Sequence, residues 1–333
     1  MTEPVHVRVA DSSQVGEARR LAVRMAQAAG FNEQRAGEVA IIASELANNL
    51  HRYGGGGEIM LQQLQTRHGP AIEVLAIDSG PGMNNVQQCL ADGYSTGGTP
   101  GNGLGAVRRL SSEFDIFSRP DNGSIVLSRV QASSNGSTGS KGMSWGVVSR
   151  NARGETVCGD TWRLAERDSG VALLIADGLG HGPDACEAAQ AVAKAFSEDP
   201  FGGPSRILSE AHKRTGGTRG AAAAAVEIDL NGKTVRFCGV GNISASLLSG
   251  GGEGRGLVSH NGIVGHQATR FQEFEYSWPA NGVLIMHSDG LQSRWDMQKY
   301  PGLISRHPSV ISALLERDFT RGRDDVTVLV MRL

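Results

Sequence analysis

The sequence has few cysteines, no long apolar run and almost no net charge. Its four cysteines, Cys89, Cys158, Cys186 and Cys238, are scattered and form no CxxC pair, which argues against a zinc site or a disulfide framework. No stretch approaches the roughly 20 apolar residues that a membrane-spanning helix needs. The first residues, MTEPVHVRVADSS, lack the basic-then-apolar order of a secretory signal. We therefore expect a cytoplasmic protein with no membrane partner.

The charge balance also excludes classes of partner. Lys and Arg together number 32 against 34 Asp and Glu, which gives a formal net charge of -2. Such a balance does not favour a nucleic-acid partner. Hydrophobic residues make up 39% and charged residues 20% of the 333 residues, a composition typical of globular proteins. The length favours two domains.

A small, polar segment divides the chain. Residues 131–142, QASSNGSTGSKG, have no apolar periodicity, which predicts a flexible linker. We expect one domain over residues 1–131, a linker over 132–142 and a second domain over 143–333. The alternative is a long surface loop within one domain.

The apolar patterns differ on the two sides of this segment. Before it, helical spacing over 15–25 and 39–50 and strands near 59–64, 72–77, 114–117 and 125–130 predict one sheet with helices on one face. After it, strands dominate, and they predict two packed sheets with helices outside. The predicted fold class is therefore α/β (α+β), in two domains.

Three motifs in the N-terminal half carry candidate chemistry. Glu45 and Asn49, four residues apart in ELANN, share a helix face, where a carboxylate and an amide can position a nucleophile and Mg²⁺. Asp78, in DSGPGM, follows the apolar run 72–77 and can accept a hydrogen bond from the amine of adenine. The glycine-rich residues 97–105 precede a helix and can bind phosphates. Singly, each also fits an ordinary helix pair, turn or loop.

The order of these motifs resembles the ATP-binding domain of the GHKL superfamily. The text ASELANNL, DSGPGM, DGYSTGG and GNGLGAVRRL is most similar to the RsbT branch of its serine kinases. The resemblance implies that Glu45 is the general base, that Asn49 binds Mg²⁺, and that Asp78 binds adenine. It also implies that glycines shape the ATP site, and that a lid covers the phosphates. The remaining residues implied for ATP binding are Gly80, Gly82, Gly101, Gly103, Leu104 and Gly105.

Aspartates at strand ends are the candidates in the C-terminal half. They are Asp160, Asp177, Asp289, Asp324 and Asp325. Carboxylates that converge on one spot can bind hard divalent cations, which in turn activate water and orient a phosphate. For each aspartate alone, the alternative is an ordinary turn residue. His181 can act as a general acid, but we favour a role in fixing the turn between strand and helix.

The series GD, DGLGHG, GVGNI, SDG and DDVTVLV resembles the SpoIIE-type branch of the metal-dependent protein phosphatases. GVGNI, at residues 239–243, is most similar to RsbX-like members. The resemblance implies that Asp177 bridges two Mn²⁺ or Mg²⁺ ions and that Gly178 contributes its carbonyl. Asp289 and Asp324 would complete the ligand set, and Asp160 would be an outer ligand or hold a water. Asp325 would support its neighbour; the alternative is that Asp325, and not Asp324, binds the metal directly.

Together the resemblances imply a partner-switching regulator of a stress-response type. Its N-terminal domain would phosphorylate, with ATP and Mg²⁺, a serine or threonine of a STAS-domain protein, and its C-terminal domain would remove the phosphate. A sigma factor or a larger signalling complex is a further candidate partner. The alternative is that the N-terminal domain is a nucleotide-gated binding module and that the phosphatase is the only enzyme.

Overall fold

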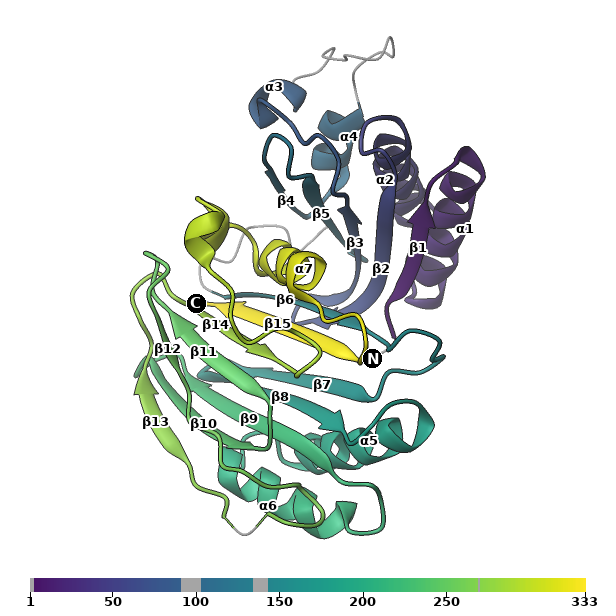
Figure 1. The fold of residues 1–333 in the computed structure, drawn as a ribbon. Coiled ribbons are helices and arrows are strands. Elements are labelled where there is room, and N and C mark those ends of the chain that lie inside the picture. The colour runs from purple at the N-terminus through teal and green to yellow at the C-terminus, as the bar shows by residue number, and fades with distance from the viewer. Residues whose placement is uncertain (1–2, 91–102, 134–142, 269) are drawn as a thin grey trace. The chain divides into compact units, whose positions relative to one another are not determined.

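The computed structural model describes residues 3–90, 103–133, 143–268 and 270–333. The chain divides into two compact units, Met1–Lys141 and Gly142–Leu333 (Figure 1). Of the predicted linker, only residues 132 and 133 lie in the described part. No helix within the described ranges is long and apolar enough to cross a membrane.

The first unit is a five-stranded antiparallel sheet with the order β1-β2-β3-β5-β4. Helices α1 and α2 cover one face of this sheet (Figure 1), as the sequence predicts. The elements are β1 Val5–Val9, α1 Ser12–Ala28, α2 Glu33–Arg52, β2 Gly57–Thr66, β3 Gly69–Ile77, α3 Val86–Cys89, α4 Gly103–Leu110, β4 Glu113–Ser118 and β5 Ser124–Gln131.

Local capping sets where the two long helices begin. The Asp11 side chain accepts a hydrogen bond from the Ser13 N–H, and the Gln14 side chain accepts one from the Asp11 N–H. These bonds form a capping box at the start of α1. Asn32 is the cap of α2, and its side chain accepts a hydrogen bond from the Arg35 N–H at 2.8 Å. Alanines and aliphatic residues of both helices then pack on the sheet and form the core.

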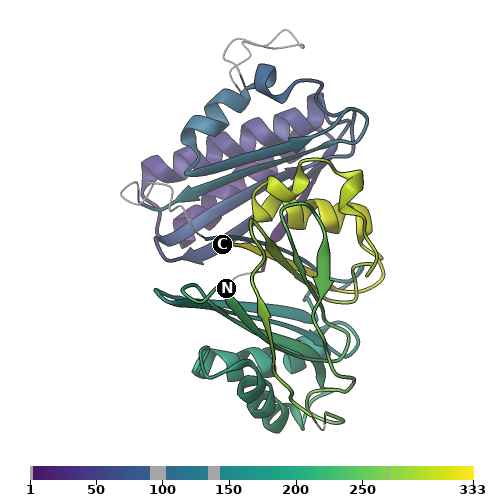
Figure 2. The same cartoon turned by 90° about the vertical axis from the view of Figure 1, so that its left-hand side faces the viewer.

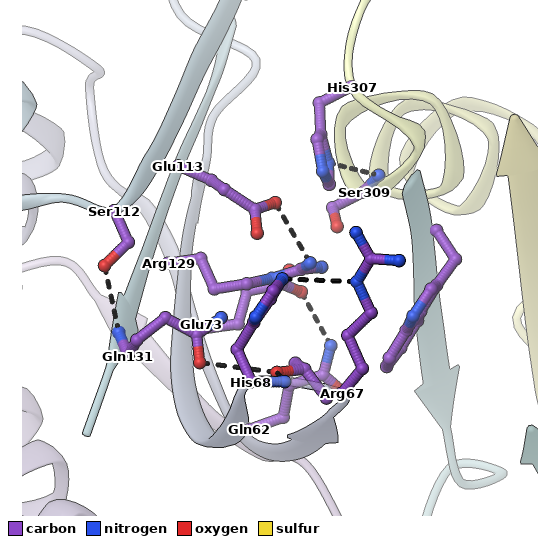
Figure 3. Close-up of polar contacts among 12 residues, drawn as sticks. Gln62, Arg67, His68, Glu73, Ser112, Glu113, Arg129, Gln131, His307 and Ser309 are labelled. Carbon is purple, nitrogen blue, oxygen red and sulfur yellow. Dashed lines mark hydrogen bonds and ion pairs between the residues drawn. The ribbon is translucent and has the colours of Figure 1, made fainter. Parts of the chain in front are cut away.

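The opposite face of this sheet carries a ladder of polar side chains (Figure 3). Gln62, Glu73, Arg129 and Glu113 are partners in register on four adjacent strands. Gln62 donates to Glu73 at 2.7 Å, and Arg129 contacts Glu73 at 2.6 Å and Glu113 at 3.1 Å. Glu73 and Arg129 are buried, so their pairing offsets the cost of removing two charges from water.

The second unit contains two five-stranded sheets, ordered β13-β10-β9-β8-β7 and β12-β11-β14-β15-β6. Trp145 of β6 and Trp162 of β7 lie 5.7 Å apart, between ring centroids, where the two sheets meet. The strands are β6 Ser144–Arg150, β7 Asp160–Arg167, β8 Gly170–Gly178, β9 Ala221–Asp229, β10 Thr234–Val240, β11 Ser244–Leu248, β12 Gly254–Gly256, β13 Phe274–Ser277, β14 Val283–His287 and β15 Val326–Arg332.

Helices lie outside both sheets of this unit, as Figure 2 also shows. Helices α5 Pro183–Glu198 and α6 Pro204–Thr215 pack on the sheet that contains β8 and β9. Helix α7 Pro308–Phe319 packs on β6 and β15, and the short 3-10 helices η2 Met297–Lys299 and η3 Leu303–Ser305 precede it. The layers are therefore helix, sheet, sheet and helix, which matches the predicted fold class.

Candidate functional sites

Two aspartates of the second unit lie side by side at one sheet edge. Asp160 is the first residue of β7, and Asp177 is the last residue but one of β8. The strands are antiparallel, and the two residues are direct partners in register. The sequence predicts an aspartate that follows a strand at position 160, whereas the structure places it where a strand begins.

The Asp160 carboxylate is fixed from the other sheet. The Ser288 hydroxyl donates to Asp160 Oδ2 at 2.6 Å and accepts from the Thr327 N–H at 2.9 Å. Asp160 Oδ1 is buried, and no hydrogen-bond partner reaches it within the described residues. Burial raises the pKa of Asp160 to about 7, although the hydrogen bond from Ser288 opposes this shift.

Asp177 lies near four other carboxylates. Burial, followed by the charges of Asp160, Asp289, Asp324 and Asp325, raises its pKa to about 9. Each of these charges favours the protonated form, because two nearby carboxylates cannot both ionise without cost. The predicted aspartates are thus brought into one electrostatically coupled group.

The other three aspartates have separate supports. Asp289 accepts from Asn242 Nδ2 at 2.6 Å, and burial followed by the charge of Asp324 raises its pKa. Asp325 Oδ1 accepts from the Ala152 N–H at 2.8 Å, and burial raises its pKa. Asp324 accepts from the Asp325 N–H and is less buried than Asp325.

This donor set fits divalent cations. Carboxylate oxygens are the ligands that Mg²⁺ and Mn²⁺ prefer, and buried carboxylates require a cation or a proton. Within residues 3–90, 103–133, 143–268 and 270–333, no three acidic, His or Cys side chains already enclose a position for an ion. The fit therefore rests on the uncompensated charge and on the unpartnered Asp160 Oδ1.

The turn after Asp177 is closely packed. A Cβ at Gly178 would lie 1.9 Å from the Ala185 carbonyl oxygen, so only glycine lets α5 approach the strand. His181 Nδ1 lies 2.5 Å from Glu155 Oε1, and the imidazole is mostly exposed. This contact ties the turn to the segment before β7, consistent with the positional role that the sequence favours for His181.

The first unit places its candidates around helix α2. Glu45 and Asn49 lie on the same face, one turn apart, and both are partly buried. A Cβ at Gly103 would lie 2.7 Å from Glu45 Oε2, so the start of α4 approaches the proposed general base. Leu104 and Gly105 follow in the first turn of α4. Gly101 lies outside the described residues.

Asp78 lies at the end of β3 and is buried. Its Oδ1 accepts from the Gly80 N–H at 2.9 Å and from the Ser124 N–H at 3.2 Å. Gly82 has a φ of 68°, and a Cβ there would lie 2.0 Å from the Arg119 carbonyl oxygen. The structure thus gives Gly82 a second reason to be glycine, because the loop to β5 passes directly beside it.

Two family models match separate parts of the chain. The model described as Stage II sporulation protein E (SpoIIE) matches residues 167–333. The chain belongs to the SpoIIE family. The model described as a histidine kinase-like ATPase domain matches residues 9–129 of this SpoIIE-family chain. The predicted combination of a GHKL-type ATP-binding domain with a metal-dependent protein phosphatase domain is confirmed.

Two curated relatives are similar to the chain, a kinase and a phosphatase. The serine/threonine-protein kinase RsbT of Bacillus subtilis (strain 168) is 32% identical over 126 residues, which cover 38% of the SpoIIE-family chain and 95% of RsbT. The phosphoserine phosphatase RsbX of the same organism is 25% identical over 189 residues, which cover 56% of the chain and 93% of RsbX. The chain is therefore similar to two separate enzymes.

Solved structures agree with this fold. A structure from a study of the bacterial stressosome, as a modular system adapted to control secondary messenger signalling, has a TM-score of 0.53 and 27% identity. It covers 57% of the SpoIIE-family chain and 99% of its own. RsbX in complex with magnesium has a TM-score of 0.51 and 23% identity and covers 58% and 96% of the two chains. The latter likeness shows the fold alone.

Sequence reasoning missed three residues of the phosphatase site. They are Asn242, which donates to Asp289; Ser288, which donates to Asp160; and Glu155, which contacts His181. Asn242 lies in GVGNI and Ser288 in SDG, so both stand within motifs that carry the resemblance. Glu155 stands in no such motif, and only the fold brings it to the turn.

Proposed function

We propose that the chain is a bifunctional partner-switching regulator that phosphorylates and dephosphorylates a serine or threonine of a STAS-domain protein. The observation that carries the phosphatase half is the pair formed by Asp160 and Asp177. They are partners across adjacent strands, and both have raised pKa values. Such crowding is unfavourable without a cation and is useful where metal ions hold water and phosphate.

In this proposal Asp177, the Gly178 carbonyl, Asp289 and Asp324 hold Mn²⁺ or Mg²⁺ ions, and Asp160 is an outer ligand. Bound metal would supply an activated water. Asp325, held by the Ala152 N–H, fixes the backbone that presents Asp324. Hydrolysis breaks the bond between phosphorus and the serine or threonine oxygen. The attacking water forms the new P–O bond, and a proton goes to the leaving oxygen, which yields inorganic phosphate and the free hydroxyl.

In the kinase half, Glu45 accepts the proton of the substrate hydroxyl. The hydroxyl oxygen attacks the γ-phosphorus of ATP, and ADP leaves. Asn49, one turn further along α2, holds Mg²⁺. Asp78 binds the adenine amine, with Gly80 and Gly82 beside it. The start of α4, from Gly103, forms part of the phosphate lid. The approach of Gly103 to Glu45 supports this arrangement.

The partner class follows from both halves. The chain is similar to both RsbT and RsbX, and a stressosome-related structure covers 57% of it. A STAS-domain antagonist is therefore our proposed substrate, and a sigma factor or a larger complex is a further partner. Because opposed activities in one chain would hydrolyse ATP without net effect, we propose that the ADP/ATP ratio or partner binding biases them.

The test uses an Asp177→Ala variant, which silences dephosphorylation. It is incubated with labelled ATP, Mg²⁺ and STAS-domain proteins encoded in the same genome. Label should appear on one STAS protein and disappear when wild-type chain and Mn²⁺ are added. A second variant, Glu45→Gln in the Asp177→Ala background, should bind ATP and transfer no label.

If ATP binds and no STAS protein is labelled, the kinase proposal fails. The N-terminal domain is then better described as a nucleotide-gated binding module attached to a phosphatase. Partner binding that survives Glu45→Gln, in a protein that never transfers label, would support that description.

A further inference from the structure

Strand register places Arg219 beside the proposed metal-binding turn. Strands β8 and β9 are antiparallel, with Asp177 opposite Ala222 and Gly178 opposite Ala221. The residues before Ala221 therefore run alongside those after Gly178. The Leu179 N–H donates to the Gly220 carbonyl at 3.0 Å, which holds the two segments together at the edge that carries Asp177.

The Arg219 guanidinium lies directly over this turn. A Cβ at Gly180 would lie 3.1 Å from Arg219 Nη1, and the absence of a side chain there leaves the guanidinium its place. Arg219 Nη2 lies 2.5 Å from Asp184 Oδ2, in the first turn of α5. The side chains of this ion pair are 50% and 62% exposed.

Such an exposed pair contributes little to folding, so Arg219 can exchange its partner at low cost. A guanidinium binds phosphate oxygens in a bidentate manner, through short and strong charge-assisted hydrogen bonds. A phosphate dianion therefore competes well with a single carboxylate. Arg321 also lies near the aspartates, but its charge already favours ionised Asp289.

We infer that Arg219 binds the phosphate group of the phosphoserine or phosphothreonine substrate, with Asp184 as its partner when no substrate is bound. The inference rests on the proposed phosphatase function. It adds a phosphate-binding cation, from the segment between α6 and β9, to a site otherwise built from carboxylates.

The experiment measures hydrolysis of a phosphoserine peptide by the Mn²⁺-loaded full chain. Arg219→Ala should raise KM by about 10- to 100-fold, as expected for the loss of hydrogen bonds to a charged group, while kcat changes much less. Arg219→Lys should recover part of the loss. Calorimetry with inorganic phosphate should show a matching loss of affinity, while the affinity for Mn²⁺ stays unchanged.

Two controls separate phosphate binding from a structural ion pair. Arg214, on α6, forms a similar exposed ion pair with Glu198, at the end of α5. Arg214→Ala removes this pair and should leave KM unchanged. Asp184→Asn keeps Arg219 and should give a KM no higher than that of the wild type. If Asp184→Asn raises KM as much as Arg219→Ala does, the pair is structural and the inference is wrong.

Failure of the proposed function has a different signature. If the wild-type chain hydrolyses no phosphopeptide, the phosphatase proposal fails, and the phosphate titration still decides the role of Arg219. Weaker binding of inorganic phosphate to Arg219→Ala than to the wild type would support the inference. Equal binding, or no binding to either protein, would overturn it.

Discussion

Replacement of Asp177 by Asn should stabilise the metal-free protein at alkaline pH and destabilise the metal-loaded protein. The folded state raises the pKa of Asp177 from 3.8 to about 9, first through burial and then through neighbouring carboxylates. A raised carboxyl pKa means that the folded state binds a proton that the unfolded state releases. The associated stability is therefore complete below pH 3.8 and is lost as the pH rises toward 9.

The magnitude follows from the two pKa values. Each pH unit inside this window can remove at most ~1.4 kcal/mol, so the upper bound between pH 6 and pH 8 is ~2.7 kcal/mol. The Asp177 side chain is partly exposed to solvent. Screening of its charge by water therefore reduces the expected loss of stability to about 1–2 kcal/mol. Asn cannot ionise, so Asp177→Asn should avoid most of this loss.

Tryptophan fluorescence isolates the relevant unit. All four tryptophans, Trp145, Trp162, Trp278 and Trp295, belong to the second unit, so urea unfolding followed by their emission does not report on the first unit. In EDTA at pH 8 the Asp177→Asn variant should unfold at higher urea than the wild type. With Mn²⁺ the order should reverse, because the wild type gains binding energy that the variant loses.

The control is Asp168→Asn, at an exposed turn between β7 and β8, which should match the wild type in both conditions. The reasoning is refuted if wild-type stability in EDTA does not fall between pH 6 and pH 8. It is equally refuted if Asp177→Asn is the less stable protein with and without metal.

Three further outcomes can be measured. Gly82→Ala should destabilise the first unit by about 2–4 kcal/mol in circular dichroism melts, because the φ of 68° and the Arg119 carbonyl leave no place for a Cβ. The control Gly69→Ala, where a Cβ would meet open space, should cost about 1 kcal/mol. Asn242→Leu should weaken Mn²⁺ affinity about tenfold in calorimetry, because Asp289 loses the donor that orients it. Ser288→Ala should lower the free energy of unfolding of the second unit by about 1–3 kcal/mol, because Asp160 loses its hydrogen bond.

Much of the fold was predictable because its central strands and long helices have strong local signals. Asn32 caps α2 as its residue type suggests, and the apolar run at β8 is a buried central strand. Strands β1, β7, β12 and β13 were not predicted. All four are edge strands, and β7 is mostly polar after its first residues. Edge strands are held by pairing with a neighbour, which a local pattern does not reveal.

The candidate sites were predictable as sets of residue types and not as contacts. Each aspartate stands out beside an apolar run, but only the β7–β8 register makes Asp160 and Asp177 partners. Asn242 and Glu155 are far in sequence from the residues they contact. No single-sequence pattern links residues at such separations, so their roles depend on the tertiary structure.

The contrast between paired and unpaired buried charges is the strongest argument that the aspartate group is functional. In the first unit, Glu73 is matched by Arg129 at 2.6 Å. In the second, Glu316 is matched by Arg150 at 2.8 Å. Among the described residues, no Lys, Arg or His forms an ion pair with Asp160 or Asp177, and burial, followed by the charges of neighbouring carboxylates, raises the pKa of both. A structural role at these positions would be met by neutral side chains at lower cost. Carboxylates at both positions are therefore best explained by cations that bind from solution.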